Sequence, residues 1–373
     1  MALIQKQKSS GIGSLKNRRR EGRKKMQQLR DVNIQSITQL EPPESYLTKL
    51  PSDKKIEDFV LSARQQIIDV LTGRDHRLLC VVGPCSIHDD EAGLEYAEKL
   101  AGLSRQIQGR ILVVMRAYFE KPRTTVGWKG LIFDPDLNGT FDMGSGLYRA
   151  RALLSEIAKM GLPVATELLD PITPQYIADL LSWAAIGART VESQPHRQMA
   201  SGLSMPIGFK NPTSGRVQIA VDAITAAKSS HAFLGTDFSG RVAIVITKGN
   251  PYCHLVLRGG DTGPNYESAS TADAILRLEK AGLSPCLMVD CSHDNSKRDI
   301  VRQAVIFSEV IGQRLSGNTG IIGLMLESNL FPGNQKINGN GLADLQYGVS
   351  ITDPCIGWDQ TEELLTEAYE LLV

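Results

Sequence analysis

The feature that most constrains the fold of this chain is a regular alternation of short apolar segments and helical ones. The apolar runs lie at 78–87, 111–118, 163–170, 184–190, 206–212, 231–236, 286–293 and 320–328. Between them, stretches such as 94–107 and 146–160 repeat apolar residues at helical spacing. Apolar strands separated by helices indicate a parallel sheet covered on both faces, and eight such units are typical of a (β/α)8 barrel.

We therefore predict a single (β/α)8 barrel, an α/β TIM barrel, over residues 45–373. An open, doubly wound sheet is the alternative, because an alternating pattern alone does not show that a sheet closes. The stretch 243–260 interrupts the rhythm. It predicts an extra β-hairpin, inserted after a sixth strand at 231–236.

The first 44 residues differ from the rest of the chain. The segment 6–25 is basic, polar and poor in large apolar side chains, and it lacks the apolar core of a secretory signal. Blocks of like charge repel and stay solvated, so we expect a mobile N-terminal arm. An arm that docks on a partner subunit, an organelle transit peptide and a nucleic-acid-binding arm are the alternatives.

Composition limits the class of protein. The chain has 41 Lys and Arg against 41 Asp and Glu, and this balance argues against a general nucleic-acid binder. Its apolar runs are too short to span a membrane. Six cysteines form no C-x-x-C pair in this long chain, which indicates free thiols in a reducing compartment and predicts a cytoplasmic protein.

Polar residues cluster where the apolar runs end, and in a barrel these ends meet on the face that carries active sites. The residues are Cys85, Arg116, Glu167, Arg189, Lys210, His293 and Glu327. For any one of them, a solvated strand end is the simpler reading. Seven runs that end alike favour a common site.

One group of these residues is cationic, and it extends into the segment 115–130, which has four Lys and Arg against one acid. The group consists of Arg116, Lys121, Arg123, Arg189, Lys210 and Arg258. Such charges would repel one another without an anion, and phosphate and carboxylate suit them. The alternative is that their stems cover apolar surface, which fits Lys129 better than Arg116.

A second group can bind metal. Cys85, His293, Glu327 and Asp353 offer a thiolate, an imidazole and two carboxylates. This set accepts Mn, Fe, Co or Zn without strong preference. The four residues lie far apart in the sequence, so the prediction depends on the barrel bringing them together.

Several of these residues belong to long, uncommon motifs. The motifs are GPCSIHD (83–89), FEKPRTTVGWKGLI (119–132), SWAAIGARTVESQ (182–194), GFKNPTSG (208–215), HLVLRGG (254–260), VDCSHDNS (289–296) and SITDPCIGW (350–358). From about residue 45 to 365 the chain resembles the type I, microbial 3-deoxy-D-arabino-heptulosonate 7-phosphate (DAHP) synthases, and it is most similar to their Tyr-sensitive branch. The resemblance implies a (β/α)8 barrel and a homodimer or homotetramer.

The resemblance also implies the reaction, in which phosphoenolpyruvate and erythrose 4-phosphate condense and phosphate is released, the first step of the shikimate pathway. It implies one divalent metal ion held by Cys85, His293, Glu327 and Asp353. Phosphoenolpyruvate would be bound by Arg116, Lys121, Arg189, Lys210 and Arg258, and erythrose 4-phosphate by Pro122, Arg123 and Thr124. Lys121 would stabilise or protonate the new alkoxide, and Glu167 would orient a water. The alternatives are a sister synthase that uses arabinose 5-phosphate and a non-catalytic effector-binding protein.

Members of this family are often inhibited by Phe, Tyr or Trp, and the resemblance implies a pocket for such an effector. It would involve Asp170, Pro174, Gln175, Gly202, Leu203, Phe233, Gly235 and Val245, together with the N-terminal segment of another subunit. Gly235 stands where Phe-sensitive members have Ser, and the space favours the phenolic hydroxyl of Tyr. Two departures bear on regulation: the basic arm, and Pro212-Thr213-Ser214 in place of Gly-Thr-Asp.

Overall fold

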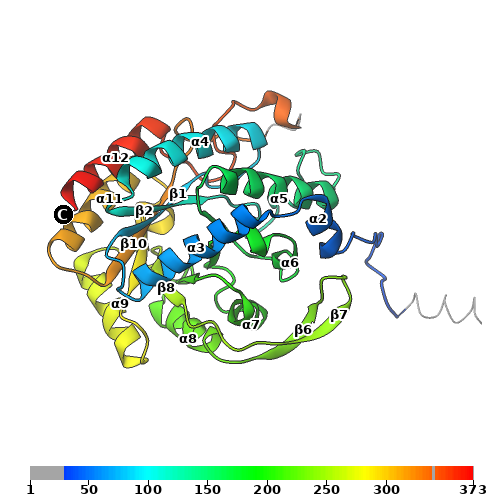
Figure 1. Cartoon of the computed structure of the whole chain (residues 1–373), viewed down its shortest axis with the longest axis horizontal. Helices are drawn as coiled ribbons and strands as arrows, with labels where there is room; N and C mark the ends of the chain where they lie inside the picture. The colour runs from blue at the N-terminus through cyan, green and yellow to red at the C-terminus, as the bar shows by residue number, and fades with distance from the viewer. Residues whose placement is uncertain (1–28, 338–340, 373) are drawn as a thin grey trace, which may run out of the picture. The chain divides into compact units, whose positions relative to one another are not determined.

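Eight parallel strands close into a barrel, which confirms the predicted fold (Figure 1). The computed structural model describes residues 29–337 and 341–372. In barrel order the strands are β1 (Leu78–Gly83), β2 (Ile111–Arg116), β3 (Val164–Glu167), β4 (Trp183–Ile186), β5 (Ile207–Lys210), β8 (Cys253–Leu257), β9 (Leu287–Asp290) and β10 (Ile321–Glu327). Strand β10 pairs with β1 in parallel and closes the sheet. The open, doubly wound alternative is therefore wrong.

Helices surround the strands, as Figure 1 shows. They are α2 (Pro43–Lys49), α3 (Lys54–Leu71), α4 (Asp90–Ile107), α5 (Met143–Lys159), α6 (Pro174–Ile177), α7 (Gln194–Gly202), α8 (Val217–Ala227), α9 (Ser268–Lys280), α10 (His293–Ser296), α11 (Ile300–Leu315) and α12 (Trp358–Leu371), with 3-10 turns at Ala178–Leu180 and Gly341–Asp344. Asp53, Asp89 and Asp299 precede α3, α4 and α11, and each accepts backbone N–H groups of the first turn. No helix in the described ranges is long and apolar enough to cross a membrane.

The predicted sixth strand was wrong, and so was the position of the hairpin. Residues of the run 231–236 form β6 (Ala232–Thr236), which pairs antiparallel with β7 (Val242–Ile246) outside the barrel. The sixth barrel strand is β8, and the hairpin precedes it. Burial explains the difference: every residue of β8 is buried, whereas the hairpin strands alternate between exposed and half-buried residues. Such alternation is typical of a ribbon with one solvated face.

The barrel interior near the start of β4 is filled by a large side chain, Trp183. Its Nε1–H donates to Nε2 of the buried His254 on β8, at 3.1 Å. Gly208 leaves room for the indole, since a Cβ there would lie 2.2 Å from the ring. This packing closes the interior below the strand ends and leaves the carboxyl end of the barrel for polar residues.

The described residues divide into two units at the Leu40–Glu41 bond. In the first unit, Ile34 N–H donates to the carbonyl of Asp31 and forms a turn. Residues 1–28, which contain the basic segment, lie outside the described residues. The mobile arm over 1–44 stays a prediction.

Candidate active site

The carboxyl ends of the strands gather the residues that the sequence singled out. Arg116, Glu167, Lys210 and Glu327 are the last residues of β2, β3, β5 and β10. The others follow in the loops after β1 (Cys85), β4 (Arg189) and β8 (Arg258) and at the start of α10 after β9 (His293), and Asp353 lies in the segment before α12. The register between β1 and β10 places Gly83 beside Glu327, and this brings Cys85 next to that carboxylate.

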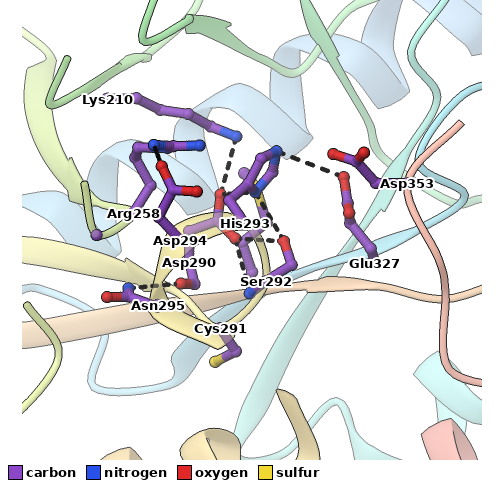
Figure 2. Close-up of polar contacts among 12 residues, drawn as sticks. Lys210, Arg258, Asp290, Cys291, Ser292, His293, Asp294, Asn295, Glu327 and Asp353 are labelled. Carbon is purple, nitrogen blue, oxygen red and sulfur yellow. Dashed lines mark hydrogen bonds and ion pairs between the residues drawn. The ribbon is translucent and has the colours of Figure 1, made fainter. Parts of the chain in front are cut away.

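Three of the four predicted metal ligands form a compact group. The ligand atoms of Cys85, Glu327 and Asp353 all lie within 4.8 Å of one another. His293 is adjacent, with Nε2 at 3.6 Å from Glu327 Oε1 (Figure 2). One soft thiolate, one imidazole and two carboxylates suit a divalent transition metal, so the residues present fit the ion that the sequence predicted.

The electrostatics of this group favour a protonated Cys85 thiol over a free thiolate. Burial raises the pKa of the Cys85 thiol and the Glu327 carboxylate raises it further, whereas Lys121 and Arg116 lower it. Burial alone would raise the pKa of Asp353, yet His293 and the neighbouring cations lower it. Metal binding here would therefore displace the Cys85 proton, and the affinity of the site would rise with pH.

Sequence reasoning missed a residue at the centre of this cluster, Asp290. Its fully buried carboxylate accepts from Lys210 Nζ at 2.9 Å, lies 2.9 Å from His293 Nδ1, and accepts from the Ser292 hydroxyl at 2.6 Å (Figure 2). Burial would raise the pKa of Asp290, but His293 and Lys210 hold it well below its usual range. The ionised carboxylate orients the imidazole and leaves Nε2 facing Glu327.

The signal for Asp290 was present in the sequence. It is the last residue of an apolar strand, three positions before His293, but the prediction took only the histidine from this strand end. The local backbone is also unusual. His293 has a φ of 55°, a left-handed conformation that a non-glycine residue rarely adopts and that tends to occur at functional sites.

Three of the predicted phosphoenolpyruvate-binding cations contact the acids and the thiol of this cluster, and a fourth contacts Asp294, the residue after His293. Arg116 Nη2 lies 2.8 Å from Glu327 Oε1, with both side chains buried, and Lys121 Nζ lies 3.1 Å from Cys85 Sγ. Lys210 pairs with Asp290 as described, and Arg258 forms an ion pair with Asp294 (Figure 2). The cations and the candidate metal ligands therefore form one interlocked network. The fifth cation, Arg189, does not join it.

Arg189 lies at the rim with the residues predicted for erythrose 4-phosphate. Its Nε donates to Thr124 Oγ1 at 3.3 Å, and Arg123 Nε donates to the carbonyl of Trp128 at 2.7 Å. Thr124 and Lys129 are exposed, whereas Pro122 and Arg123 are half-buried. The structure thus brings Thr124 and Arg189 together, although they are 65 positions apart.

Glu167 is buried at the end of β3. Its carboxylate needs the space beside Gly187, because a Cβ there would lie 2.0 Å from Glu167 Oε1. No ion pair of Glu167 occurs among the described residues, although its negative charge is near enough to Lys121 to help raise the pKa of that ammonium.

The predicted effector residues are brought together in part. Pro174, Gln175, Gly202 and Leu203 line a pocket of about 410 Å³ that Phe238, at the tip of the hairpin, also lines. Phe233 and Val245 are paired across the hairpin, and Gly235 packs near Val245 on the same half-buried face. Asp170 lies outside the residues that line this pocket, and it accepts the N–H of Ile172 at 2.8 Å. Phe238 was not predicted, because it lies in a hairpin turn with no pattern of its own.

A barrel that gathers potential metal ligands and buried cations at its carboxyl end is the arrangement of an enzyme for anionic substrates. The family model described as DAHP synthetase I family matches residues 53–366, and the chain belongs to this family. The family assignment confirms the expected activity, that of a DAHP synthase, at the first step of the shikimate pathway and with feedback regulation by an aromatic amino acid.

Named relatives agree with this assignment. The Tyr-sensitive phospho-2-dehydro-3-deoxyheptonate aldolase of Escherichia coli K12 is 50% identical over 342 residues, which cover 92% of this chain and 96% of the relative. The Trp-sensitive enzyme of Enterobacter agglomerans is 51% identical over 341 residues, covering 91% and 96%. The solved structure of the aldolase from Francisella tularensis SCHU S4 matches with a TM-score of 0.88 and 47% identity, covering 91% of this chain and 98% of that one. Relatives with different effectors are equally similar, so identity alone does not identify the effector of this chain.

Proposed function

We propose that this chain condenses phosphoenolpyruvate with erythrose 4-phosphate at the carboxyl end of its barrel, giving DAHP and phosphate. One observation carries the proposal: the candidate metal ligands and four cations meet there, through Arg116–Glu327, Lys121–Cys85, Lys210–Asp290 and Arg258–Asp294. The anionic substrate and the metal would then be neighbours, as a reaction between an enol phosphate and an aldehyde requires.

We place the metal ion on Cys85, His293, Glu327 and Asp353, with Mn, Fe, Co and Zn as the candidates. The chemistry that such an ion supplies when bound is polarisation of the aldehyde carbonyl. Asp290 supports the site by holding His293 Nδ1, so that Nε2 is free to coordinate.

The cations of the network bind phosphoenolpyruvate in this proposal. Arg116 and Arg258 offer planar guanidinium groups for phosphate or carboxylate oxygens, and Lys121 and Lys210 offer point charges. Arg189 adds a fifth cation from the rim. Because Arg116 and Lys210 are buried, their charges are only weakly screened, and an anion that enters the site is held strongly.

The chain's own residues also handle the protons and the water. C3 of the enol phosphate attacks the aldehyde carbon, and Lys121, the half-buried ammonium beside Cys85, donates a proton to the developing alkoxide. Water then adds at C2 and loses a proton, and phosphate leaves with its bridging oxygen. In this proposal Glu167 orients that water; its carboxylate is buried at a strand end without a cation partner among the described ion pairs.

The second substrate is bound at the rim. Pro122, Arg123 and Thr124 follow Lys121 directly, so a phosphate held by Arg123 and Thr124 points its aldehyde towards the Lys121 ammonium. The contact between Thr124 and Arg189 joins this element to the phosphoenolpyruvate side of the site. A longer aldose phosphate would need more room between its phosphate at Arg123 and Thr124 and its aldehyde at the Lys121 ammonium. The short element therefore favours erythrose 4-phosphate over arabinose 5-phosphate.

The test is phosphate release from phosphoenolpyruvate with each aldose phosphate in turn, before and after chelation and Mn²⁺ add-back. We expect release only with erythrose 4-phosphate and metal. Release with arabinose 5-phosphate alone would favour the sister reaction, and no release with any metal would leave an effector-binding protein.

We also propose that Tyr is the inhibitor, and that the enzyme is a cytoplasmic homodimer or homotetramer. The pocket lined by Gln175, Gly202 and Phe238 is large enough for an aromatic amino acid, and Gly235 leaves the hairpin face without a side chain. Adding Tyr, Phe and Trp singly to the phosphate-release assay tests the effector, and sedimentation of the protein tests the assembly.

A further inference from the structure

Glu120 is a buried carboxylate that takes no part in the reaction described above. It stands directly before Lys121 and is 1% exposed. It has no cation partner among the ion pairs of the described residues. Instead it accepts three hydrogen bonds from one loop, the loop after β3: Leu169 N–H at 3.2 Å, Asp170 N–H at 3.1 Å and Thr173 Oγ1–H at 3.2 Å.

The segment that carries Glu120 has little freedom to move independently. Lys121 N–H donates to the carbonyl of Lys129 at 2.8 Å, and Ile132 N–H donates to that of Phe119. The chain crosses closely at Gly130, where a Cβ would lie 2.1 Å from the Phe119 carbonyl oxygen. A displacement of Glu120 would therefore be passed on to Lys121 and the residues that follow it.

The loop on the other side continues into the pocket. Thr173 is followed by Pro174 and Gln175, both of which line the 410 Å³ cavity. The start of the loop is fixed separately, because His196 Nε2 lies 2.6 Å from the carbonyl oxygen of Leu169. Glu120 therefore joins this fixed start, through Leu169, to Asp170 and Thr173, which lead to the pocket.

We infer that Glu120 is a positioning residue that couples the segment 169–175, the loop after β3 and the start of α6, to Lys121 and the Arg123–Thr124 rim. The inference rests on the proposed function for the identity of the substrates and the effector. A purely structural carboxylate would only stabilise the fold. A coupling carboxylate also makes the placement of the rim depend on the loop, so changes in the loop alter the use of erythrose 4-phosphate from a distance.

Two variants break the link from opposite sides. Glu120→Gln keeps the volume but turns an amide N–H₂ towards donors, and Thr173→Val removes one donor without touching the substrate site. Ile172→Ala is the matched control, because this side chain lies in the same loop and is 46% exposed. For each protein, KM for both substrates, kcat, the response to Tyr, Phe and Trp, and effector affinity by calorimetry are measured on the metal-loaded enzyme.

We expect both variants to raise KM for erythrose 4-phosphate about fivefold or more, with KM for phosphoenolpyruvate within about twofold. The effector should still bind, but maximal inhibition should fall. Ile172→Ala should behave as wild type.

Unchanged KM values and undiminished inhibition in both variants would overturn the coupling. Equal losses in all parameters that follow a lowered melting temperature would assign Glu120 a structural role instead. Inactive wild-type enzyme in the same assay would refute the proposed function. The coupling would then be tested by calorimetry alone: it stands if substrate changes the affinity for the effector in wild type but not in the two variants, and it fails otherwise.

Discussion

Replacing Asp290 by Asn removes one negative charge and leaves the shape of the side chain unchanged. In the wild type the two carboxylate oxygens serve Lys210, His293 and Ser292 at once. The amide of Asn has one acceptor oxygen and one N–H₂ group. Asp290 Oδ2 faces both Lys210 Nζ and His293 Nδ1, and Oδ1 accepts from Ser292, so the Asn oxygen can serve the first two only if its N–H₂ group turns towards the Ser292 donors.

The expected magnitude follows from burial. Lys210 is 2% exposed and Asp290 is 0% exposed, so the variant leaves an ammonium with no counter-charge of its own in the barrel interior. Removing one partner of a buried pair costs about 3–5 kcal/mol, and we expect about 3 kcal/mol because one acceptor remains. Loss of the carboxylate that orients a metal-binding histidine weakens metal binding about 10- to 100-fold.

Both effects are measurable on the purified protein. Urea unfolding of the metal-free protein gives the free energy of unfolding, and calorimetric titration with Mn²⁺ gives the metal affinity. Asp299→Asn is the matched control, since this exposed residue only caps α11 and Asn caps equally well. An Asp290→Asn protein within about 0.5 kcal/mol and about twofold of wild type would refute the reasoning.

Three further predictions concern other parts of the barrel. In the proposed mechanism the Lys121 ammonium donates a proton and is not a metal ligand, so Lys121→Met should lower kcat about 100-fold or more in the phosphate-release assay while Mn²⁺ affinity by calorimetry stays within about threefold. A larger loss of metal binding than of kcat would contradict that role. Burial lowers the pKa of His254 from 6.5 to about 4, so the unfolded chain takes up the proton first, and the free energy of unfolding should fall by about 3 kcal/mol as pH drops from 6.5 to 4. Urea unfolding at several pH values should show a weaker pH dependence of this free energy in His254→Gln, and the same pH dependence as in wild type would contradict the role of this histidine. Gly208→Ala should destabilise the fold by about 1–3 kcal/mol, because its Cβ would overlap the Trp183 ring, and an unchanged melting temperature would show that the indole moves freely.

The barrel could be predicted because seven of its strands are apolar runs, buried on both faces, at regular intervals. The remaining strand, β8, could not be recognised by the same signal, because the apolar runs at 231–236 and 253–257 are both candidates for the sixth position in the barrel. Both are short and β-rich, and only the outward alternation of Leu234 and Ile244 on the hairpin distinguishes them. Tertiary packing, which the sequence pattern does not contain, decided which strand joined β5.

Part of the candidate site could also be predicted from the sequence, from the polar residues at the ends of the strands. Residues such as Arg116 and Glu327 end apolar strands, so a closed barrel must bring them to one face. Asp290 and Glu120 were missed for a physical reason: their role lies in contacts with segments remote in sequence, such as Lys210 and the loop at 169–173. The position of Asp290 at a strand end could have marked it as a site residue, but charge and spacing along the chain do not show which distant residues either carboxylate contacts.

The central claim is that Cys85, His293, Glu327 and Asp353 hold the metal ion on which condensation depends. The most direct test measures bound metal and phosphate release together, in wild type, Cys85→Ala and Cys291→Ala. Cys291 is a buried cysteine near the site whose side chain points away from the metal group (Figure 2), so it controls for the loss of a buried thiol. We predict one tightly bound ion and release that requires both substrates in wild type and Cys291→Ala, and loss of both the ion and the release in Cys85→Ala. Activity that survives in Cys85→Ala after chelation would contradict the claim.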